Sequence, residues 1–340
     1  MLLVRPVTVS DHAEILALAK EAGIGMTSLP PDSGVLEKKI ARSVASFAGK
    51  KESKGNEVFL FVLEDTEKKK LVGTCGIIAH VGLTHPFYSY KLSTIVQASD
   101  TVGIYSQQRV LHMVNDYTGA TEIGSLFLLP AYRRDGIGKF LSRCRYLMLA
   151  ECPALFSDTV ISEIRGVQGE NGDSPFYKNL AQHFFQMDFQ RADFINATQG
   201  GQFISDLMPK YPIYVNLLDP KAQTVIGVPL QASLPAKQLL EQEGFRHQGY
   251  IDVFDGGPTM QAERASIRSV SESRRSKIAA LKPLEHAPLY MAASTSVQDF
   301  RMGLVRLEDH KGGLAMEPEA AKALKLDVGD EMRFIRFLPL

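Results

Sequence analysis

The sequence has no surplus of charge of either sign, few cysteines and no long hydrophobic run, and each absence excludes a class of protein. Lys and Arg total 38, as do Asp and Glu, so the formal net charge is zero at pH 7. A protein whose main partner is nucleic acid concentrates Lys and Arg on one surface to neutralise phosphates. We therefore expect no nucleic-acid partner, because the short basic cluster Arg274, Arg275 and Lys277 is typical of a solvated linker.

Membrane, secreted and metal-binding classes are also disfavoured. No apolar run reaches the roughly 18 residues that span a bilayer, and residues 1–7 lack the basic flank and cleavage pattern of a signal peptide. The three cysteines, Cys75, Cys144 and Cys152, are odd in number and have no paired metal-ligand spacing. We expect reduced, mostly buried thiols, no metal, no membrane partner and a cytoplasmic location.

The chain is long enough for about two domains at roughly 150 residues each. Of its 340 residues, 45% are hydrophobic, which is typical of a globular protein with a buried core. Local patterns predict a helix that begins after Asp11 and is ended by Gly23 and Gly25, and further helices at residues 36–47, about 136–150 and 235–244. Strands are predicted at residues 2–6, 58–64, 71–81, 122–129 and 245–254. This order predicts a mixed α/β fold.

Three further segments complete the predicted organisation. On the helix at about 136–150, Arg143 and Arg145 are expected to be solvated. Residues 155–226 are aromatic and punctuated by proline, which predicts a packed insertion with one or two helices. Alternating polarity at 288–308 and 330–338, with a short helix near 317–324, predicts a small β-rich C-terminal unit.

The most informative stretch is a strand that leads into a glycine-containing turn and then a helix. The turn has the form Arg-x-x-Gly-x-Gly, with Arg133, Gly136 and Gly138 at its defined positions. Glycine lets the backbone approach a phosphate closely, and the start of a helix offers unpaired N–H groups. Arg133 and Arg134 would add charge-assisted hydrogen bonds. The spacing matches neither a dinucleotide-binding G-x-G-x-x-G nor a P-loop, because Phe140 follows the lysine.

This turn resembles the acyl-CoA-binding turn of the GNAT N-acyltransferase superfamily. The resemblance implies that the cofactor pyrophosphate sits on the turn and that the pantetheine arm pairs with the preceding strand. A helix that closes on Gly244 and Phe245 before a strand resembles a second GNAT feature. The implied domains are a GNAT-like domain at 1–258 with an insertion at about 155–226, and a linker with the C-terminal unit at 259–340. The implied cofactor contacts are Leu126, Phe127, Leu128, Arg133, Arg134, Gly136, Ile137 and Gly138.

Many further motifs, in one order, resemble the arginine N-succinyltransferase family. The match runs nearly end to end, from Arg5 to Arg301. The family resemblance implies that succinyl-CoA and L-arginine react to give N2-succinylarginine, the first step of arginine catabolism by succinyl transfer. The matching segments are Thr27–Pro30, Phe61–Asp65, Pro86–Tyr88, Asn115–Gly119, Glu163–Gly166, Ser174–Phe176, His183–Phe189, Leu207–Pro209, Pro212–Tyr214 and Tyr250–Pro258.

One position departs from the family pattern. The family has a proton-transferring histidine before the late helix, and Leu230 stands there by spacing. Two alternatives therefore stay open beside the arginine activity. The enzyme has an altered amine or acyl specificity, or the chain is a non-catalytic subunit paired with a histidine-bearing paralogue. The last alternative resembles members of the family that occur as two related subunits. The resemblance therefore leaves a homo-oligomer, or a hetero-oligomer with a paralogous subunit, as a possible assembly.

Another residue would then have to accept the proton, since acyl transfer to an amine needs the amine neutral. Glu122 is the first candidate, because it precedes Arg133 by eleven residues, a spacing that resembles the glutamate base of GNAT histone acetyltransferases. A partly apolar setting would raise its pKa towards a useful value. The alternative is a strand-end salt bridge. His247, on the strand after the late helix, is the second candidate; its alternative is a structural role.

Arginine recognition needs carboxylates that grip a guanidinium and a cation for the substrate carboxylate. Asp116 and Glu163 are the candidate acids, with Asp188 and Asp255 as further possibilities, and Arg165 is the candidate cation. The alternative for each of these side chains, favoured when it is taken singly, is a structural ion pair or a turn, and the sequence does not choose among them.

Overall fold

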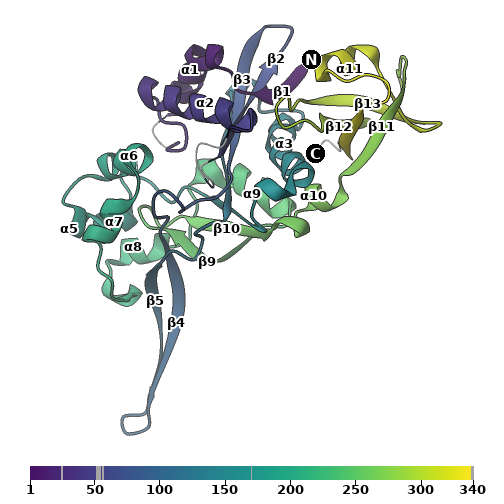
Figure 1. Ribbon diagram of the computed structural model, residues 1–340. Coiled ribbons are helices and arrows are strands. Elements are labelled where there is room, and N and C mark those ends of the chain that lie inside the picture. The colour runs from purple at the N-terminus through teal and green to yellow at the C-terminus, as the bar shows by residue number, and fades with distance from the viewer. Residues whose placement is uncertain (24–25, 51–54, 56, 170, 338–340) are drawn as a thin grey trace. The chain divides into compact units, whose positions relative to one another are not determined.

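The computed structural model describes residues 1–23, 26–50, 55, 57–169 and 171–337 (Figure 1). The chain divides into two compact units built from non-contiguous segments. Unit 1 comprises Met1–Ala79, Thr121–Asp158 and Glu263–Leu340, and unit 2 comprises the two segments between them. The predicted division between residues 258 and 259 stays a prediction; the nearest unit boundary falls between Ala262 and Glu263.

Unit 1 is a mixed α/β structure in which one sheet runs through the strands in the order β12-β15-β11-β14-β13-β1-β2-β3-β6. Strand β12 also pairs with β13, so the five C-terminal strands close on themselves. Its strands are β1 (Leu2–Pro6), β2 (Val58–Asp65), β3 (Lys70–Ile78), β6 (Thr121–Leu128), β11 (Arg274–Leu281), β12 (Leu289–Ser294), β13 (Met302–His310), β14 (Gly313–Met316) and β15 (Glu331–Arg336). Its α-helices are α1 (His12–Ala22), α2 (Ser33–Phe47), α3 (Ile137–Glu151), α10 (Arg268–Glu272) and α11 (Pro318–Leu324).

These elements follow the predicted pattern closely in unit 1. The apolar runs of β2 and β3 form the predicted antiparallel hairpin, buried along nearly its whole length. The apolar faces of α1 and α2 pack on it in one core that includes Ile15, Leu36, Leu60 and Phe127. Helix α1 ends at Gly23, which has a φ of 79° as expected for a C-terminal glycine. Gly25, the other predicted stop, lies outside the described residues.

The prediction that Arg143 and Arg145 are solvated is wrong. Helix α3 is buried on nearly every side, and these side chains are only 1% and 2% exposed. The Arg145 guanidinium donates to the Ser142 carbonyl at 3.0 Å and to the Gly124 carbonyl on β6 at 3.4 Å. A buried arginine is tolerated where its fixed fork of donors meets backbone oxygens. Arg145 therefore joins α3 to β6 rather than facing water.

The strands of unit 2 lie in the order β7-β10-β9-β4-β5-β8. The pairs β10–β9, β9–β4, β4–β5 and β5–β8 are antiparallel. Its strands are β4 (Ser89–Ser99), β5 (Ile104–Val114), β7 (Thr159–Glu163), β8 (Ile213–Tyr214), β9 (Arg246–Asp252) and β10 (Pro258–Glu263). Its α-helices are α4 (Pro175–Asn179), α5 (Gln182–Phe185), α6 (Phe189–Gln199), α7 (Gln202–Leu207), α8 (Pro220–Val225) and α9 (Leu234–Gln242).

The predicted insertion is packed, but its helix content was predicted too low. Described residues between 155 and 226 carry the five short helices α4 to α8 instead of one or two. An aromatic core that includes Tyr90, Phe176, Tyr177 and Phe254 holds them together. Short helices lack the long 3.6-residue period by which a helix is recognised in sequence, so the prediction missed most of them.

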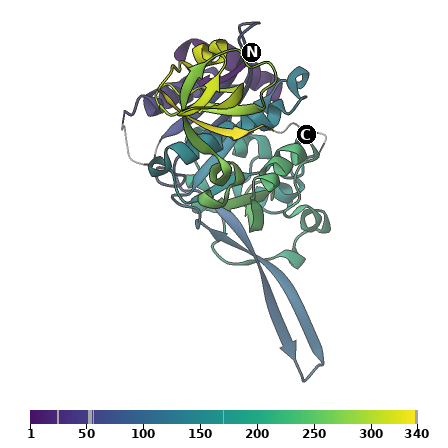
Figure 2. The same cartoon turned by 90° about the vertical axis from the view of Figure 1, so that its right-hand side faces the viewer.

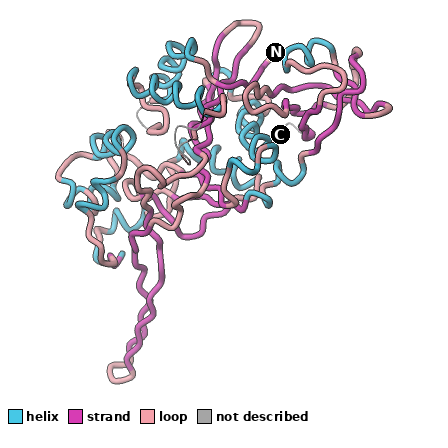
Figure 3. Tube along the Cα trace, viewed as in Figure 1, coloured by secondary structure: helices cyan, strands magenta, loops and turns pink. Residues whose placement is uncertain are grey.

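The hairpin of β4 and β5 was not predicted. Its eleven-residue strands pair along their full length, and it extends as a two-stranded ribbon (Figures 2 and 3). Strand β9 pairs with β4 only at Ser89–Lys91, and β8 pairs with β5 only at Val110 and Leu111. Both edges beyond these points are without a described strand partner. As for membranes, none of the described helices combines the length and apolarity that a bilayer crossing requires.

Candidate active site

The predicted turn after β6 is present in unit 1. A single 3-10 turn, Pro130–Tyr132, separates β6 from residues 133–136, and α3 begins at Ile137. The Arg133 side chain folds back over the turn, donating from Nε to the Leu128 carbonyl at 2.9 Å, with its guanidinium 5.7 Å from the Phe127 ring centre. Arg134 points outwards, with a side chain that is 73% exposed and lies 3.7 Å from the Asp135 carboxylate.

Backbone amides of this turn are available to an anion. The amides of Asp135, Gly136 and Gly138 donate to no acceptor in the described part of the chain, whereas the Ile137 amide donates to the Arg134 carbonyl at 3.0 Å. The turn leads directly into the fifteen-residue helix α3, whose N-terminal end carries partial positive charge. This combination is chemically suited to a phosphate or pyrophosphate.

The two glycines of the turn have different reasons for lacking a side chain. Gly136 has a φ of 73°, and an added Cβ would lie 2.9 Å from Cζ of Phe337. Gly138 has ordinary helical geometry, and an added Cβ would meet nothing nearer than Leu128 at 4.0 Å. Gly136 is therefore required by the backbone and by the packing of Phe337, while Gly138 leaves open space beside the free amides.

Strand β6 is interrupted by a bulge just before the turn. Thr74 pairs with Phe127 and Gly76 with Gly124, so β6 carries one more residue than β3 over this stretch. Ser125 takes up the extra length with a φ of 51°, which is rare for a residue with a side chain. The Ser125 amide donates a hydrogen bond to the Ser28 hydroxyl at 3.2 Å. Leu126 is half-buried beside the bulge, and Phe127 and Leu128 are buried.

Glu122 lies on β6 near a lysine that the sequence analysis did not single out. Burial raises the pKa of the Glu122 carboxyl above its ordinary value, and the Lys39 ammonium partly offsets this. Lys39, on α2, donates to the Ser28 carbonyl and, at 3.1 Å, to the Ser125 hydroxyl. Burial lowers the pKa of Lys39 to about 8. No local signal identifies Lys39, because its partners lie 11 and 86 residues away in the chain.

In unit 2, Arg165 is held by carboxylates of the protein itself. Its Nη1 and Nη2 atoms form a two-point contact with Asp193, and its Nε lies 3.3 Å from the Asp255 carboxylate. The Phe189 ring centre lies 5.1 Å from the guanidinium carbon. Burial raises the pKa of nearby Asp252 to about 8, and the Asp255 charge adds to the effect. Arg165 is thus engaged on several sides by the chain.

The other predicted acids of unit 2 have distinct surroundings. Asp116 is 45% exposed, accepts a hydrogen bond from the Tyr250 hydroxyl at 2.8 Å, and lies 3.8 Å from the Lys91 ammonium. Glu163 is half-buried at the end of β7. Asp188 caps α6 by accepting from the Arg191 amide at 2.8 Å. Asp116 and Asp188 are both exposed, and Asp188 is engaged as a helix cap.

His247 lies beside the segment in which the family histidine is absent. Its Nε2 atom would be 3.6 Å from a Cβ built on Gly227, and its Nδ1 atom lies 3.3 Å from the Thr259 carbonyl. The amide of Leu230 donates to the Arg165 carbonyl at 2.7 Å, which fixes the same segment against the end of β7. His247 is exposed. Among predicted site residues, Glu122 and the turn belong to unit 1, while His247, Asp116, Glu163 and Arg165 belong to unit 2.

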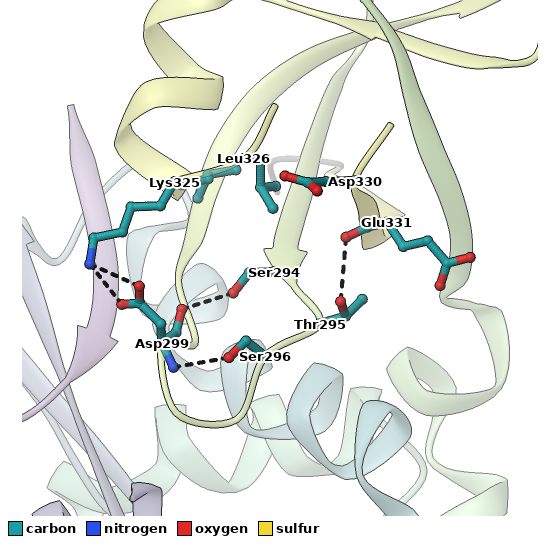
Figure 4. A pocket seen from close by; sticks show the side chains of 9 residues that line it. Ser294, Thr295, Ser296, Asp299, Lys325, Leu326, Asp330 and Glu331 are labelled. Atoms are coloured by element: carbon teal, nitrogen blue, oxygen red, sulfur yellow. Dashed lines mark hydrogen bonds and ion pairs between the residues drawn. The ribbon is translucent and has the colours of Figure 1, made fainter. Parts of the chain in front are cut away.

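A small pocket of about 290 Å³ lies in the C-terminal part of unit 1, apart from every predicted site residue (Figure 4). Asp299 and Lys325 close one side through hydrogen bonds of 2.8 and 3.1 Å. Its polar lining carries no catalytic constellation. Across the described residues, no three His, Cys, Asp or Glu side chains are grouped to hold a metal ion.

Comparisons with known proteins agree along the whole chain. A family model described as the arginine N-succinyltransferase beta subunit matches residues 2–269, and one described as its C-terminal domain matches residues 274–336. An arginine N-succinyltransferase from Escherichia coli O6:K15:H31 is 39% identical over 337 residues, covering 99% of this chain and 98% of the relative. One from Escherichia coli K12 (DH10B) matches with the same identity and coverage.

A solved structure is also similar. It is that of the arginine/ornithine succinyltransferase subunit AI from Pseudomonas aeruginosa, with a TM-score of 0.88 and 34% identity, covering 99% of this chain and 98% of that one. The predicted family, the mixed α/β fold class and the acyltransferase class are confirmed by the structure and these similarities. The chain belongs to the arginine N-succinyltransferase family.

Proposed function

We propose that the protein transfers a succinyl group from succinyl-CoA to the α-amine of L-arginine, the first step of arginine catabolism by succinyl transfer. As an acyltransferase of this family it acts on small molecules and uses an acyl-CoA as co-substrate. The observation that carries the proposal is the row of free amides at Asp135, Gly136 and Gly138, at the start of α3. These donors would hold the pyrophosphate of the CoA moiety.

Different residues around the turn would contact different parts of CoA. The exposed Arg134 guanidinium would add a charge-assisted hydrogen bond to a phosphate oxygen. Arg133, tied to Leu128, would hold the turn against β6 while keeping its terminal nitrogens near the phosphates. The backbone of Leu126, Phe127 and Leu128 would pair with the pantetheine arm, and Ile137 would anchor the helix start through its buried side chain.

Glu122 is the proposed proton acceptor. The α-ammonium group of an amino acid is largely protonated at neutral pH, so a base must take up its proton before attack on the thioester. A carboxyl whose pKa is raised by burial is better matched to that task than an ordinary one. His247 is the alternative base, supported by its place beside Gly227 in the segment where the family histidine is expected.

Substrate recognition is proposed for three residues of unit 2. The half-exposed Asp116 carboxylate would bind the guanidinium of the substrate, with Glu163 as a second acid. Arg165 would serve the substrate carboxylate only by giving up part of its contact with Asp193 or Asp255. We therefore rank Asp116 first among the three.

A thiol-release assay with purified protein, succinyl-CoA and arginine tests the proposal directly. Turnover that is lost in Glu122→Gln and retained in His247→Gln would assign the base to Glu122. The reverse pattern would assign it to His247. Tight CoA binding with no turnover on arginine or any other amine would overturn the catalytic proposal and favour a non-catalytic subunit.

A second candidate keeps the chemistry and changes the amine. The similar Pseudomonas aeruginosa protein is described as an arginine/ornithine succinyltransferase subunit. We therefore include ornithine and a small panel of other amines in the same assay. Faster turnover with another amine than with arginine would replace arginine as the proposed substrate.

We also propose that the protein forms an oligomer with a second copy of itself through the β4–β5 hairpin. Four large apolar side chains of this ribbon are strongly exposed: Val96, Val102, Ile104 and Tyr105. Asp100 is the only formally charged residue from 92 to 108. The ribbons of two copies could therefore pack against each other over most of their length without burying an unpaired charge. An isolated two-stranded ribbon is marginally stable, which favours a partner.

Analytical ultracentrifugation of the wild type and of a triple variant, Val96→Ser with Ile104→Ser and Tyr105→Ser, tests this interface. The wild type should sediment as a dimer or larger and the variant as a monomer with unchanged circular dichroism. A monomeric wild type, or a variant that associates as before, would contradict the proposal.

A further inference from the structure

The Lys39 ammonium has donor capacity that the chain does not use. A lysine ammonium carries three N–H donors. In the described part of the chain, Lys39 makes two hydrogen bonds, to the Ser28 carbonyl and to the Ser125 hydroxyl, which leaves one donor of the ammonium without a hydrogen bond. Ser125 in turn donates to the Ser28 carbonyl at 3.2 Å, so the two serines hold the ammonium in place.

The charge around Lys39 favours an anion. The titratable groups that act on it electrostatically are Glu122 on β6 and Arg42 one turn further along α2. Burial opposes the ionisation of Glu122, which leaves the Lys39 charge without full compensation. With a pKa of about 8, Lys39 is still mostly protonated at neutral pH.

The location of Lys39 connects it to the acyl group. Its partner Ser125 occupies the bulge of β6, immediately before Leu126, Phe127 and Leu128, where the proposed function places the pantetheine arm. A succinyl thioester differs from an acetyl thioester by a carboxylate two methylene groups beyond the thioester carbonyl. That carboxylate needs a cation in any site sheltered from water.

We propose that Lys39 binds the free carboxylate of the succinyl group and so makes the enzyme select a dicarboxylic acyl-CoA over acetyl-CoA. The inference rests on the proposed function, because it assumes an acyl-CoA lying along β6. It assigns to α2 the part of the site that reads the acyl group, with Ser28 and Ser125 positioning the ammonium.

The test compares Lys39→Met with Lys38→Met, a matched control one residue away on the exposed side of α2. A hydrogen bond between charged groups contributes about 1.5–3 kcal/mol, so Lys39→Met should lower kcat/KM for succinyl-CoA about 10- to 100-fold. Its kcat/KM for acetyl-CoA should change less than about three-fold. Lys39→Arg should recover part of the succinyl-CoA activity, and Lys38→Met should match the wild type.

An equal loss with both thioesters would overturn the inference, because it would show that Lys39 acts through the fold or through Glu122 and not on the succinyl carboxylate. Equilibrium binding separates this inference from the proposed function. If the wild type turns over no acyl-CoA, calorimetric Kd values for succinyl-CoA and acetyl-CoA still test Lys39. A preference for succinyl-CoA that disappears in Lys39→Met supports the inference, and an unchanged ratio of the two Kd values rejects it.

Discussion

Each unit contains a buried cation, Arg165 in unit 2 and Lys39 in unit 1, but the two cations have different kinds of hydrogen-bond partners. In unit 2, Arg165 is gripped by Asp193 at two points and approached by Asp255, and all three side chains are nearly inaccessible. In unit 1, Lys39 donates hydrogen bonds to a carbonyl and a hydroxyl, and elsewhere in the unit the amides of Asp135, Gly136 and Gly138 have no acceptor in the described chain. Donors left over in this way suit a ligand, whereas a cation enclosed by two carboxylates of its own chain chiefly stabilises the fold.

This difference also shows what the sequence alone could not tell about Arg165. A single arginine near acids has the same signature whether it binds a substrate or its own chain. The outcome depends on how many acceptors the fold brings to it, and Asp193 and Asp255 come from segments 28 and 90 residues further along. The contrast between engaged and spare donors leads to four predictions.

Removing the engaged cation should have the largest effect. Arg165→Met would leave Asp193 and Asp255 buried without their partner, and breaking a buried ion pair costs about 3–5 kcal/mol. Urea unfolding should show this loss. Arg191→Met, an exposed position on α6, serves as the control and should shift stability by less than about 0.5 kcal/mol. A similar small change in both variants would remove the distinction drawn between the two clusters.

Introducing a carboxylate at the spare amides should weaken CoA binding without harming the fold. Gly138→Asp places negative charge in the first turn of α3, which stabilises the helix by about 0.3–1 kcal/mol but repels a pyrophosphate. Calorimetry should show at least about a 30-fold loss of CoA affinity, equivalent to about 2 kcal/mol. Gly138→Ala should lose less, because its Cβ has room. Gly136 is a poorer probe, since any side chain there would strike Phe337. Undiminished CoA affinity in Gly138→Asp would contradict the proposal that the amides at the start of α3 bind the CoA pyrophosphate.

The excess of carboxylates around Arg165 should appear as a pH dependence of stability. Because burial and the Asp255 charge raise the pKa of Asp252 to about 8, the folded state retains a proton that the unfolded chain releases above about pH 4. The contribution of Asp252 to stability should therefore fall as the pH rises from about 4 to 8. Asp252→Asn should flatten this part of the profile of Tm against pH. An identical slope in the wild type and the variant would show that Asp252 ionises as usual.

The smallest effect on stability is expected at Lys39. Lys39→Met loses two hydrogen bonds but relieves the desolvation that lowers the pKa of the ammonium, so the two changes oppose each other. The free energy of unfolding at pH 7 should change by no more than about 1 kcal/mol. A loss of about 3 kcal/mol or more would place Lys39 with Arg165 among residues that chiefly stabilise the fold.

Most of unit 1 could be predicted from local patterns, and much of unit 2 could not. The apolar runs of β2 and β3 and the strand, turn and helix around Gly136 have clear local signals. Strand β4 of the β4–β5 hairpin does alternate, with Tyr90, Leu92, Val96 and Ala98 at every second position apart from Thr94, so its strand signal is present in the sequence although the hairpin was not predicted. In helix α3 the element was predicted but the burial of its side chains was not. Arg143 and Arg145 are buried by elements from distant parts of the chain, which local patterns do not reveal.

The sequence by itself determined the family and the turn after β6, because left-handed backbone at Gly136 and a helix start at Ile137 depend on residues within a few positions of each other. Only the tertiary structure decided which charged side chains have spare donors. Lys39 and Ser125 are 86 residues apart, and the Ser125 bulge exists only through the register of β6 on β3. The partners of a buried charge are set by packing between distant segments, and that information is not local to any stretch of the sequence.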